Sequence, residues 1–219
     1  MGAAQSLFDV LKEEIVSLTL KPGTVLSRAE LQARFGVSST PIRDAFMRLS
    51  EEGLVDVFPQ HATIVTPIDL DHARQAQFLR RSLELEIVGT LAANPTAAVI
   101  ARLRGFVRQQ KAFAALGEYQ QFTNADQAFH YATYEAAGVP DLWTLVRRQS
   151  GHIDRLRRLH LPVGNKLREV VRDHTELVDA IEAGEARAAQ AVLRGHLSRS
   201  LDFAERLRAL HPEHFRAPA

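Results

Sequence analysis

The stretch of residues 27–65 limits the possible folds of this chain more than any other part of the sequence. Ser27 can form a capping box with Glu30, because its hydroxyl accepts from the Glu30 amide while the Glu30 side chain reaches back. Gly36 can adopt the positive φ of a sharp turn, and Pro41 suits the first turn of a helix. The sequence therefore predicts a short helix, a tight turn and a second helix.

The second helix is predicted to begin at about Ser39, capped by Ser38 or Ser39, and to have two different faces. Helical spacing places on its inward face Ile42, Ala45, Phe46 and Leu49. The same spacing places on its outward face Ser39, Thr40, Arg43 and Met47. Hydroxyls at a helix N-terminus suit phosphates, and an arginine suits a guanine edge. Alternating residues at 54–58 and 62–65 then predict a hairpin with Gln60 and His61 at its tip, which completes a winged helix-turn-helix.

The charge of this region does not by itself indicate DNA binding. Residues 1–66 carry six Lys/Arg and eight Asp/Glu, whereas a DNA-binding module is more often basic. Binding would depend on a local face made by Arg28, Arg43, His61 and the amides at helix ends. An ordinary small α+β element without a DNA-binding role is the alternative interpretation of the same pattern.

The sequence of this region resembles a known family. Residues 26–55 read LSRAELQARFGVSSTPIRDAFMRLSEEGLV, and PQHATIVTPID follows at 59–69. The run resembles the winged-helix domain of GntR-family transcriptional regulators, and it departs at Ser39, where an arginine is common, at Arg28-Ala29 and at His61-Ala62. The resemblance implies contacts to DNA from Ser38, Thr40 and Arg43, and also from Arg28, Ser39, Gln60 and His61.

After the predicted hairpin the sequence predicts only helices. Thr66-Pro67 ends the strand pattern, and Asp69 can cap the next helix. Helical periodicity then runs through 70–93, 96–115, 119–137, 140–161, 165–183 and 185–210. The predicted fold class is mainly α, with a winged helix-turn-helix domain at 1–66, a linker at 67–69 and an all-helical bundle of about six helices at 70–219. Residues 211–219 are expected to fray.

Composition excludes several classes of site. The chain has no cysteine, which excludes disulfides and thiolate metal sites. No run of about 18 apolar residues is present, and the N-terminus alternates charged and apolar residues as an amphipathic helix does. We therefore expect a cytoplasmic protein without a membrane partner.

Polar side chains occupy positions of the bundle that the periodicity predicts to be buried. Asp126 and His130 stand four apart on one helix, His174 lies on an apolar stripe, and His196 lies over the apolar side of the last helix. His152 has polar neighbours at helical spacing and is predicted to lie at the surface. A buried carboxylate and three buried imidazoles are unfavourable unless they are paired or bind a cation.

Two interpretations of these four residues follow from the spacing. They either bind one divalent metal between facing helices, or they are separate core histidines with Asp126 fixing a tautomer. Three nitrogens and one carboxylate suit Zn²⁺, Ni²⁺, Mn²⁺ or Fe²⁺, of which we favour Zn²⁺. Coordination positions would be left for water or a ligand.

The helical part also resembles a known domain, the effector-binding FCD domain of the FadR subfamily of GntR regulators. The resemblance covers the rest of the chain and depends on Arg80 with Leu83-Glu84, Asp126-x-x-x-His130, Asp173-His174 and Gly195-His196-Leu197. It implies that Asp126, His130, His174 and His196 bind a divalent metal, and that an organic acid completes the coordination. Asp173 stands where glutamate is usual. Arg80 is expected to clamp an effector carboxylate, with a salt bridge as its alternative role.

These observations predict a ligand-responsive, sequence-specific transcriptional regulator without catalytic residues. We name a repressor as its type, while the residues are equally compatible with an activator. A small carboxylate would bind at the metal, and a homodimer would bind a palindromic double-stranded operator. Two alternatives are a DNA-binding dimer whose histidines only stabilise the fold, and a metal-dependent hydrolase or oxygenase. The enzyme alternative would need a second carboxylate to act as a base, and the pattern places none on the same helix faces as Asp126.

Overall fold

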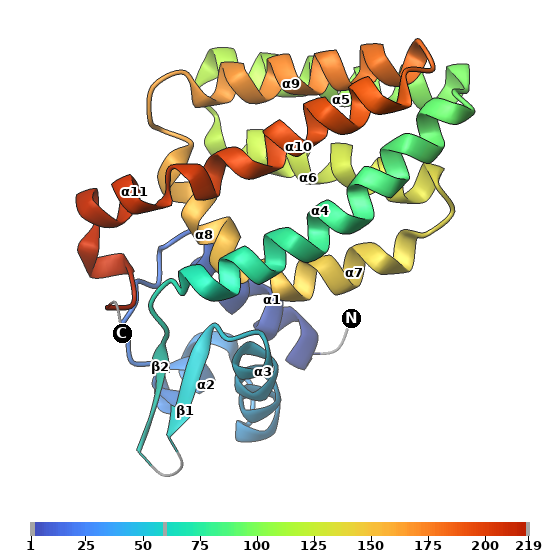
Figure 1. Cartoon of the computed structure of the whole chain (residues 1–219). Helices are drawn as coiled ribbons and strands as arrows, with labels where there is room; N and C mark the ends of the chain where they lie inside the picture. The colour runs from blue at the N-terminus through green and yellow to red at the C-terminus, as the bar shows by residue number, and fades with distance from the viewer. Residues whose placement is uncertain (1–2, 59–60, 218–219) are drawn as a thin grey trace.

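A computed structural model of the chain describes residues 3–58 and 61–217 and has a mainly α-helical fold with one β-hairpin (Figure 1). The N-terminal part contains α1 (Ala3–Val16), α2 (Arg28–Phe35), α3 (Ser39–Glu51), β1 (Val55–Phe58) and β2 (Ala62–Val65). The following part contains α4 (Leu70–Ala93), α5 (Ala97–Leu116), α6 (Tyr119–Ala136), α7 (Pro140–Gln149), α8 (Gly151–His160), α9 (Lys166–Glu182), α10 (Ala186–Asp202) and α11 (Ala204–Leu210). Gln60, predicted at the tip of the wing, lies outside the described residues.

The winged helix-turn-helix forms as the sequence predicts. The Ser27 hydroxyl accepts from the Glu30 amide at 3.3 Å, and Gly36 ends α2 with a φ of 64°. The α3 helix begins at Ser39, and Ser38 occupies its N-cap position without a side-chain hydrogen bond to the helix. The inward residues predicted for α3 are all buried. Capping, turn and amphipathic spacing together therefore fix this part of the fold.

The hairpin extends away from the helical part of the molecule (Figure 1). Its two strands are antiparallel, with Val55 opposite Val65 and Phe58 opposite Ala62. Val25 adds an isolated bridge to the second strand at Ile64. The α1 helix packs on α3, where the Arg48 guanidinium lies 3.7 Å from the centre of the Phe8 ring and Arg48 donates to Gln5 at 2.7 Å. Motion of α1 would therefore be transmitted to α3.

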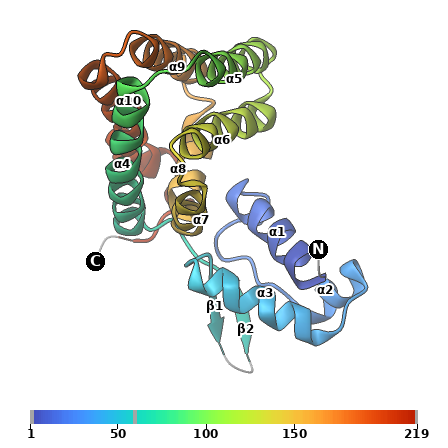
Figure 2. The same ribbon diagram turned by 90° about the vertical axis from the view of Figure 1, so that its right-hand side faces the viewer.

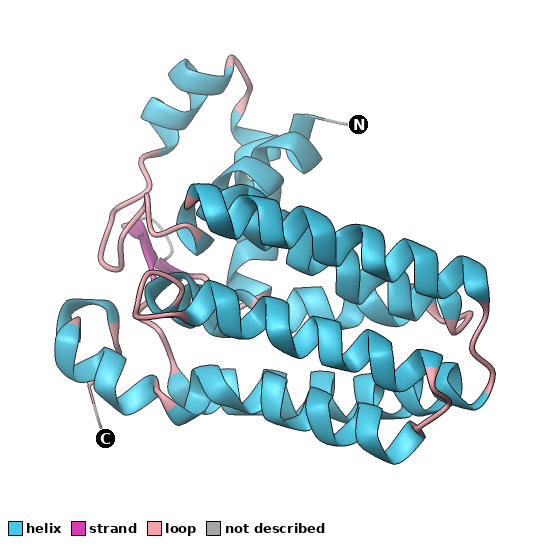
Figure 3. Cartoon of the chain, turned by 90° about the horizontal axis from the view of Figure 1, so that it is seen from above, coloured by secondary structure: helices cyan, strands magenta, loops and turns pink. Residues whose placement is uncertain are grey.

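The helices after the hairpin form a bundle with its own apolar core. Figure 3 shows its long helices lying side by side, and Figure 2 shows α1 between the bundle and α3. The core of the bundle is made by seventeen buried residues between Ile87 and Leu197. A separate core between Leu7 and Val65 supports the winged helix. The long helices α6, α9 and α10 carry the four predicted metal ligands into the bundle.

The bundle has more helices than predicted, because two predicted helices are broken. The helix predicted at 140–161 breaks at Ser150, where the hydroxyl donates to the Val146 carbonyl at 2.7 Å. At Gly151 an added Cβ would lie 2.6 Å from a methyl of Leu54, so a close approach to the winged helix requires glycine there. The helix predicted at 185–210 breaks at Phe203. Within the described residues eight α-helices therefore follow the hairpin, instead of about six, and a 3₁₀ turn at Pro212–His214 comes after them.

The prediction that residues 211–219 fray is wrong for the described part of the tail. Phe215 is buried, and it pairs with Ile68 in a parallel bridge. The Ile68 amide donates to the His214 carbonyl at 2.8 Å, and Arg216 forms an ion pair with Asp69 at 2.7 Å. The tail is held because the extended linker offers it unpaired backbone groups.

His152 is also not a surface residue, and its side chain is 2% exposed. Its Nδ1 accepts from the Asp69 amide at 3.0 Å and from Arg155 at 2.9 Å, and its ring centre lies 4.7 Å from that of His72. Arg155 is fully buried and donates to the Thr66 carbonyl at 2.6 Å. Through His152 and Arg155, helix α8 therefore holds the extended segment at 66–69 in place. Local periodicity does not indicate such a long-range contact.

The burial of His152 predicts a loss of stability in mild acid. Burial, the charge of Arg155 and the neighbouring His72 lower the pKa of His152 to about 3, whereas an unfolded histidine titrates at about 6.5. As the pH falls below 6.5, the unfolded chain binds a proton that the folded protein does not bind, so the free energy of unfolding decreases until the pH reaches the folded pKa. From pH 7 to pH 5 this one residue contributes a decrease of about 2 kcal/mol.

Urea unfolding of wild-type protein and His152→Gln in the presence of chelator measures this contribution. Glutamine keeps an acceptor for Arg155 but does not titrate in this range. The free energy of unfolding of the variant should decrease by about 2 kcal/mol less than that of wild-type protein between pH 7 and 5. Equal decreases in the two proteins would contradict the assignment.

Candidate metal centre and effector cavity

Four side chains predicted as metal ligands lie together inside the bundle. Asp126 and His130 come from α6, His174 from α9 and His196 from α10, and one ligand atom of each lies within 4.8 Å of the others. An Asp126 carboxylate oxygen lies 3.7 Å from Nε2 of His174 and 4.0 Å from Nε2 of His130. The Nε2 atoms of His174 and His196 are 3.2 Å apart.

Local structure explains why these groups meet. A spacing of four residues places Asp126 and His130 on the same side of α6. The neighbouring Phe129 ring is stacked flat on His174, with ring centres 4.1 Å apart and planes 11° apart. His130 lies edge-on to His174 at 5.1 Å, and its centre is 5.4 Å from that of His196. Packing within the core therefore orients the three imidazoles toward one point.

A polar group faces the Nδ1 atom of each imidazole and fixes its orientation. Glu84 lies 2.8 Å from Nδ1 of His130, and the Gln110 side-chain oxygen lies 2.8 Å from Nδ1 of His174. Asp173 lies 3.4 Å from Nδ1 of His196 and is itself held by Arg199. Oxygen acceptors place the proton on Nδ1, so all three rings present the lone pair of Nε2 to the shared point. Partners of this kind are typical of histidines that bind metals.

The electrostatics of the cluster favour a cation at its centre. Burial lowers the pKa of His174 well below its usual range and that of His196 to about 4, so both rings are neutral at pH 7. The Nε2 atom of His130 is buried and has no hydrogen-bond partner among the described residues. Converging lone pairs beside a carboxylate repel one another unless a cation lies between them. The residues therefore fit a divalent metal, and three nitrogens with one oxygen suit Zn²⁺, Ni²⁺, Mn²⁺ or Fe²⁺.

Arg80, predicted to clamp an effector, lies beside the cluster but outside the cavity described below. It is buried on α4, and its Nε donates to Glu84 at 2.6 Å. Burial disfavours ionisation of Glu84, but the charge of Arg80 and the contact with His130 outweigh it and lower the pKa of Glu84 below its usual range. The contact between Arg80 and Glu84 has the geometry of an ion pair, which is the alternative role predicted for Arg80. This ion pair orients Glu84, which faces Nδ1 of His130.

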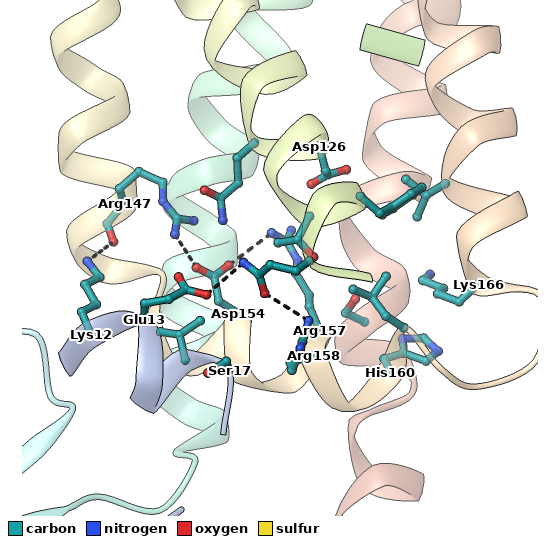
Figure 4. Close-up of a pocket in the computed structure, with 18 of the residues that line it drawn as sticks. Lys12, Glu13, Ser17, Asp126, Arg147, Asp154, Arg157, Arg158, His160 and Lys166 are labelled. Atoms are coloured by element: carbon teal, nitrogen blue, oxygen red, sulfur yellow. Dashed lines mark hydrogen bonds and ion pairs between the residues drawn. The ribbon is translucent and has the colours of Figure 1, made fainter. Parts of the chain in front are cut away.

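A cavity of about 310 Å³ lies beside the cluster, and Asp126 and His196 form part of its wall. Its lining comes from α6, α7, α8, α9 and α10, and also from α1 of the winged helix. Figure 4 shows Arg157 and Arg158 among the lining side chains, with Asp126 above them and Lys166 to one side. The charged side chains of the lining are five Lys/Arg and four Asp/Glu: Lys12, Arg147, Arg157, Arg158, Lys166, Asp9, Glu13, Asp126 and Asp154. Cationic groups in excess beside a candidate metal site suit a small anionic ligand.

The α1 helix is attached to the other walls of this cavity by polar contacts. Gln120 of α6 donates to Glu13 at 2.9 Å and accepts from Arg158 at 3.3 Å. Lys12 donates to the Arg147 carbonyl of α7 at 3.3 Å and pairs with Glu52 at 2.5 Å. A ligand that displaces any of these groups would therefore act directly on α1.

The predicted DNA contacts lie on the winged helix, away from the cavity. All the predicted DNA contacts that the structure describes are exposed: Arg28, Ser38, Ser39, Thr40, Arg43 and His61. The side chain of Arg43 is 68% exposed, and its nearest carboxylate is that of Asp44 at 3.8 Å. The first turn of α3 is therefore accessible for contact with another molecule.

Sequence reasoning missed several residues of the site. Gln110 was missed, although its spacing from Leu103 and Phe106 predicts a buried position for a polar side chain. Arg157 and Lys166 were missed because charged residues on short helices usually lie in solvent. Glu84 was noticed only through the resemblance, without its contact to His130.

The comparisons with known proteins match both parts of the chain. The family "Bacterial regulatory proteins, gntR family" matches residues 3–65, and the FCD domain matches residues 75–199. A helix-turn-helix transcriptional regulator from an unstable DNA locus of Streptomyces ambofaciens is 38% identical over 95% of this chain and 88% of its own length. The transcriptional repressor RspR of Escherichia coli K12 is 25% identical over 95% of this chain and 90% of its own length.

A solved structure shares the fold. The structure of E. coli McbR/YncC has a TM-score of 0.79 and 22% identity, and the match covers 94% of this chain and 98% of that one. Among the described residues, no helix has the length and hydropathy needed to cross a membrane.

Proposed function

Because the chain belongs to the GntR family of bacterial regulatory proteins and carries the FCD domain of the FadR subfamily, we propose that it is a repressor controlled by a small carboxylic acid. The chain is a DNA-binding transcriptional regulator, and its family is not one of enzymes. RspR is named a repressor, and we assign the same direction of control to this chain.

We propose that Asp126, His130, His174 and His196 hold one divalent ion, with zinc favoured. A bound ion supplies a positive charge and coordination positions that accept a carboxylate oxygen. The acceptors at Nδ1 keep the histidines in the tautomer that presents Nε2. In this proposal Arg80 acts through Glu84, as a positioning residue.

The observation that carries the effector proposal is the position of the cavity. Asp126, His196 and residues of α1 all line it, so a ligand beside the metal would also meet the winged helix. Cationic side chains around it suit the acid itself. A histidine cluster that only stabilised the fold would not require such a cavity.

On the DNA side, we propose that residues 1–66 form the DNA-binding domain of a homodimer that binds a palindromic operator in the cytoplasm. Ser38, Ser39 and Thr40 would bind phosphates at the start of α3, and Arg43 would contact a base edge. Arg28, Gln60 and His61 would add contacts beside this helix. One recognition helix contacts few bases, so two protomers provide the specificity.

Coupling between the two parts follows from the contacts of α1. An acid in the cavity competes with Glu13 for the Gln120 donor, and with the Gln120 oxygen for the Arg158 donor. Because α1 packs on α3 through Phe8 and Arg48, a displaced α1 changes the placement of the recognition helix. The coupling is limited by the difference in acid affinity between the two arrangements.

Operator binding by the zinc-loaded full chain, measured by fluorescence anisotropy, tests this proposal. The DNA would be selected from random sequence by the protein itself, and a panel of small carboxylic acids would be titrated. We expect at least one acid to weaken operator binding by about 5- to 150-fold, the usual range of allosteric coupling. Chelation of the metal should abolish the effect of the acid.

The variant Gln120→Leu should reduce the effect of the acid while the protein still binds zinc and operator. Gln121→Leu is the matched control, because Gln121 is the exposed neighbour on the same helix. If no acid changes operator binding in any metal-loaded form, the effector proposal is wrong. An equal loss in both variants would contradict the role of the α1 contacts.

A further inference from the structure

The cavity has a cationic end formed by Lys166, the first residue of α9. Lys166 is only 6% exposed, and Figure 4 shows its side chain directed into the cavity near His160. Its nearest carboxylate is that of Glu169, at 3.9 Å, and this carboxylate is partly in solvent. The Lys166 ammonium therefore lies inside the protein with one distant counter-ion among the described residues.

The carboxylates of Asp173, near Lys166, and of Asp154, near Arg157, already have partners. Asp173 binds Arg199 and faces His196. Arg147 holds Asp154 at 2.7 Å, which leaves Arg157 at 3.6 Å from the other oxygen of the same carboxylate. In the part of the chain that the structure describes, one carboxylate thus serves two arginines.

His160 completes this end of the cavity. It is buried, its ring is stacked on Phe203 with centres 4.5 Å apart, and its Nδ1 has no hydrogen-bond partner among the described residues. Both His160 and Lys166 line the cavity, and Figure 4 shows them next to each other. Burial and the charge of Lys166 lower the pKa of His160 to about 4. An ammonium and a buried imidazole with an unpartnered nitrogen therefore line the same end of the cavity.

Buried cations without a full counter-ion are unfavourable. Burial lowers the pKa of Lys166, and burial together with the charge of Arg80 lowers the pKa of Arg157 to about 10. A lowered pKa means that the charged form of each side chain is unfavourable in its place, and a nearby anion would stabilise that form. The candidate metal ligands Asp126 and His196 line another part of the cavity than Lys166 and His160 do, and Figure 4 shows Asp126 apart from Lys166 and His160.

We propose that the cavity contains a second anion subsite, formed by Lys166 and His160 with Arg157 beside it, so that its ligand carries two anionic groups. This inference rests on the proposed function, because the first group is the carboxylate at the metal. The second group is a carboxylate or a phosphate. The ligand is therefore a dicarboxylic acid or a phosphorylated carboxylic acid, and not a simple monocarboxylate.

Calorimetric titration of the zinc-loaded full chain tests the subsite with defined acids. Lactate and 2-hydroxybutyrate carry one anionic group, whereas malate, 2-hydroxyglutarate and 2-hydroxyadipate carry two at increasing separation. The compound 3-phosphoglycerate has a phosphate as its second group, and inorganic phosphate alone is a further probe. We expect the acid with the best separation to bind about tenfold or more tightly than lactate, as for a buried charge pair.

The Lys166→Met variant should bring the affinity of that acid down to the affinity of lactate, while lactate binding changes by less than about twofold. Lys166→Arg should keep the preference, and Lys111→Met, at an exposed lysine of α5, should leave all affinities unchanged. Circular dichroism and zinc content would establish that each variant is folded and loaded.

The outcomes separate this inference from the proposed function. If one-anion and two-anion acids bind equally well, or if Lys166→Met weakens both classes equally, the second subsite is wrong and the metal-bound carboxylate stands. If no acid binds to wild-type protein, the effector proposal and the subsite are both wrong. Tighter binding of 3-phosphoglycerate than of any dicarboxylate would identify a phosphate as the second group.

Discussion

Replacing His174 with glutamine will leave the protein unable to retain zinc during dialysis. His174 is fully buried in the cluster, and its Nε2 atom lies 3.7 Å from Asp126 and 3.2 Å from Nε2 of His196. Loss of this ligand should reduce zinc affinity by more than the roughly 10- to 100-fold that loss of a partner outside the ligand set produces. Elemental analysis and competition with a chromophoric chelator would measure it.

The same substitution should remove the stabilisation that we expect zinc to give to the wild-type protein. A ligand at about 1,000 times its dissociation constant stabilises the folded state by about 4 kcal/mol. Gln110→Leu should have a smaller effect, about 10- to 100-fold on zinc affinity, because it removes only the acceptor at Nδ1 of His174. His211→Gln, at a partly exposed histidine of the tail, is the control for loss of an imidazole. If His174→Gln retained zinc as the wild-type protein does, the ligand set would be wrong.

Replacing Arg43 with alanine should abolish specific operator binding. Arg43 lies in the first turns of α3, and its exposed guanidinium has only a distant ion pair to its neighbour Asp44. A bidentate contact to a base contributes about 1–3 kcal/mol per half-site, and a dimer would lose it twice. Anisotropy with the selected operator and with unrelated DNA would separate specific from non-specific binding.

Arg74→Ala provides the matched control for this prediction. Its side chain on α4 is 55% exposed, similar to the 68% of Arg43, and it lies outside the winged helix. The control should bind the operator as wild-type protein does. An Arg43→Ala protein that kept both affinity and base preference would show that another residue contacts the bases.

The winged helix was predictable because its signals are local. Ser27, Gly36 and Pro41 mark the boundaries of two helices, and the alternation on both sides of residues 59–61 marks the hairpin. The convergence of Asp126, His130, His174 and His196 could be suggested from their positions on apolar stripes. The choice between a metal site and separate core histidines came from the resemblance, because spacing does not show which helices face each other.

The remaining features depend on contacts between distant segments. His152 was placed at the surface because Arg148, Gln149 and Arg155 are its helical neighbours, but the linker covers this side of α8. The participation of α1 in the cavity wall was equally hidden, since Glu13 and Gln120 are far apart in the sequence. Helix breaks at Ser150 and Phe203 were missed because the periodicity continues through them. Long-range packing decides such features, and one sequence does not report it.

The most direct test of the account is the anomalous scattering of crystals of the full chain, grown with zinc and measured on both sides of the zinc absorption edge. The account predicts one strong anomalous peak inside each bundle, between the Asp126 carboxylate and the Nε2 atoms of His130, His174 and His196. Peaks only at surface histidines, or side chains of the cluster turned away from one another with no peak between them, would contradict it.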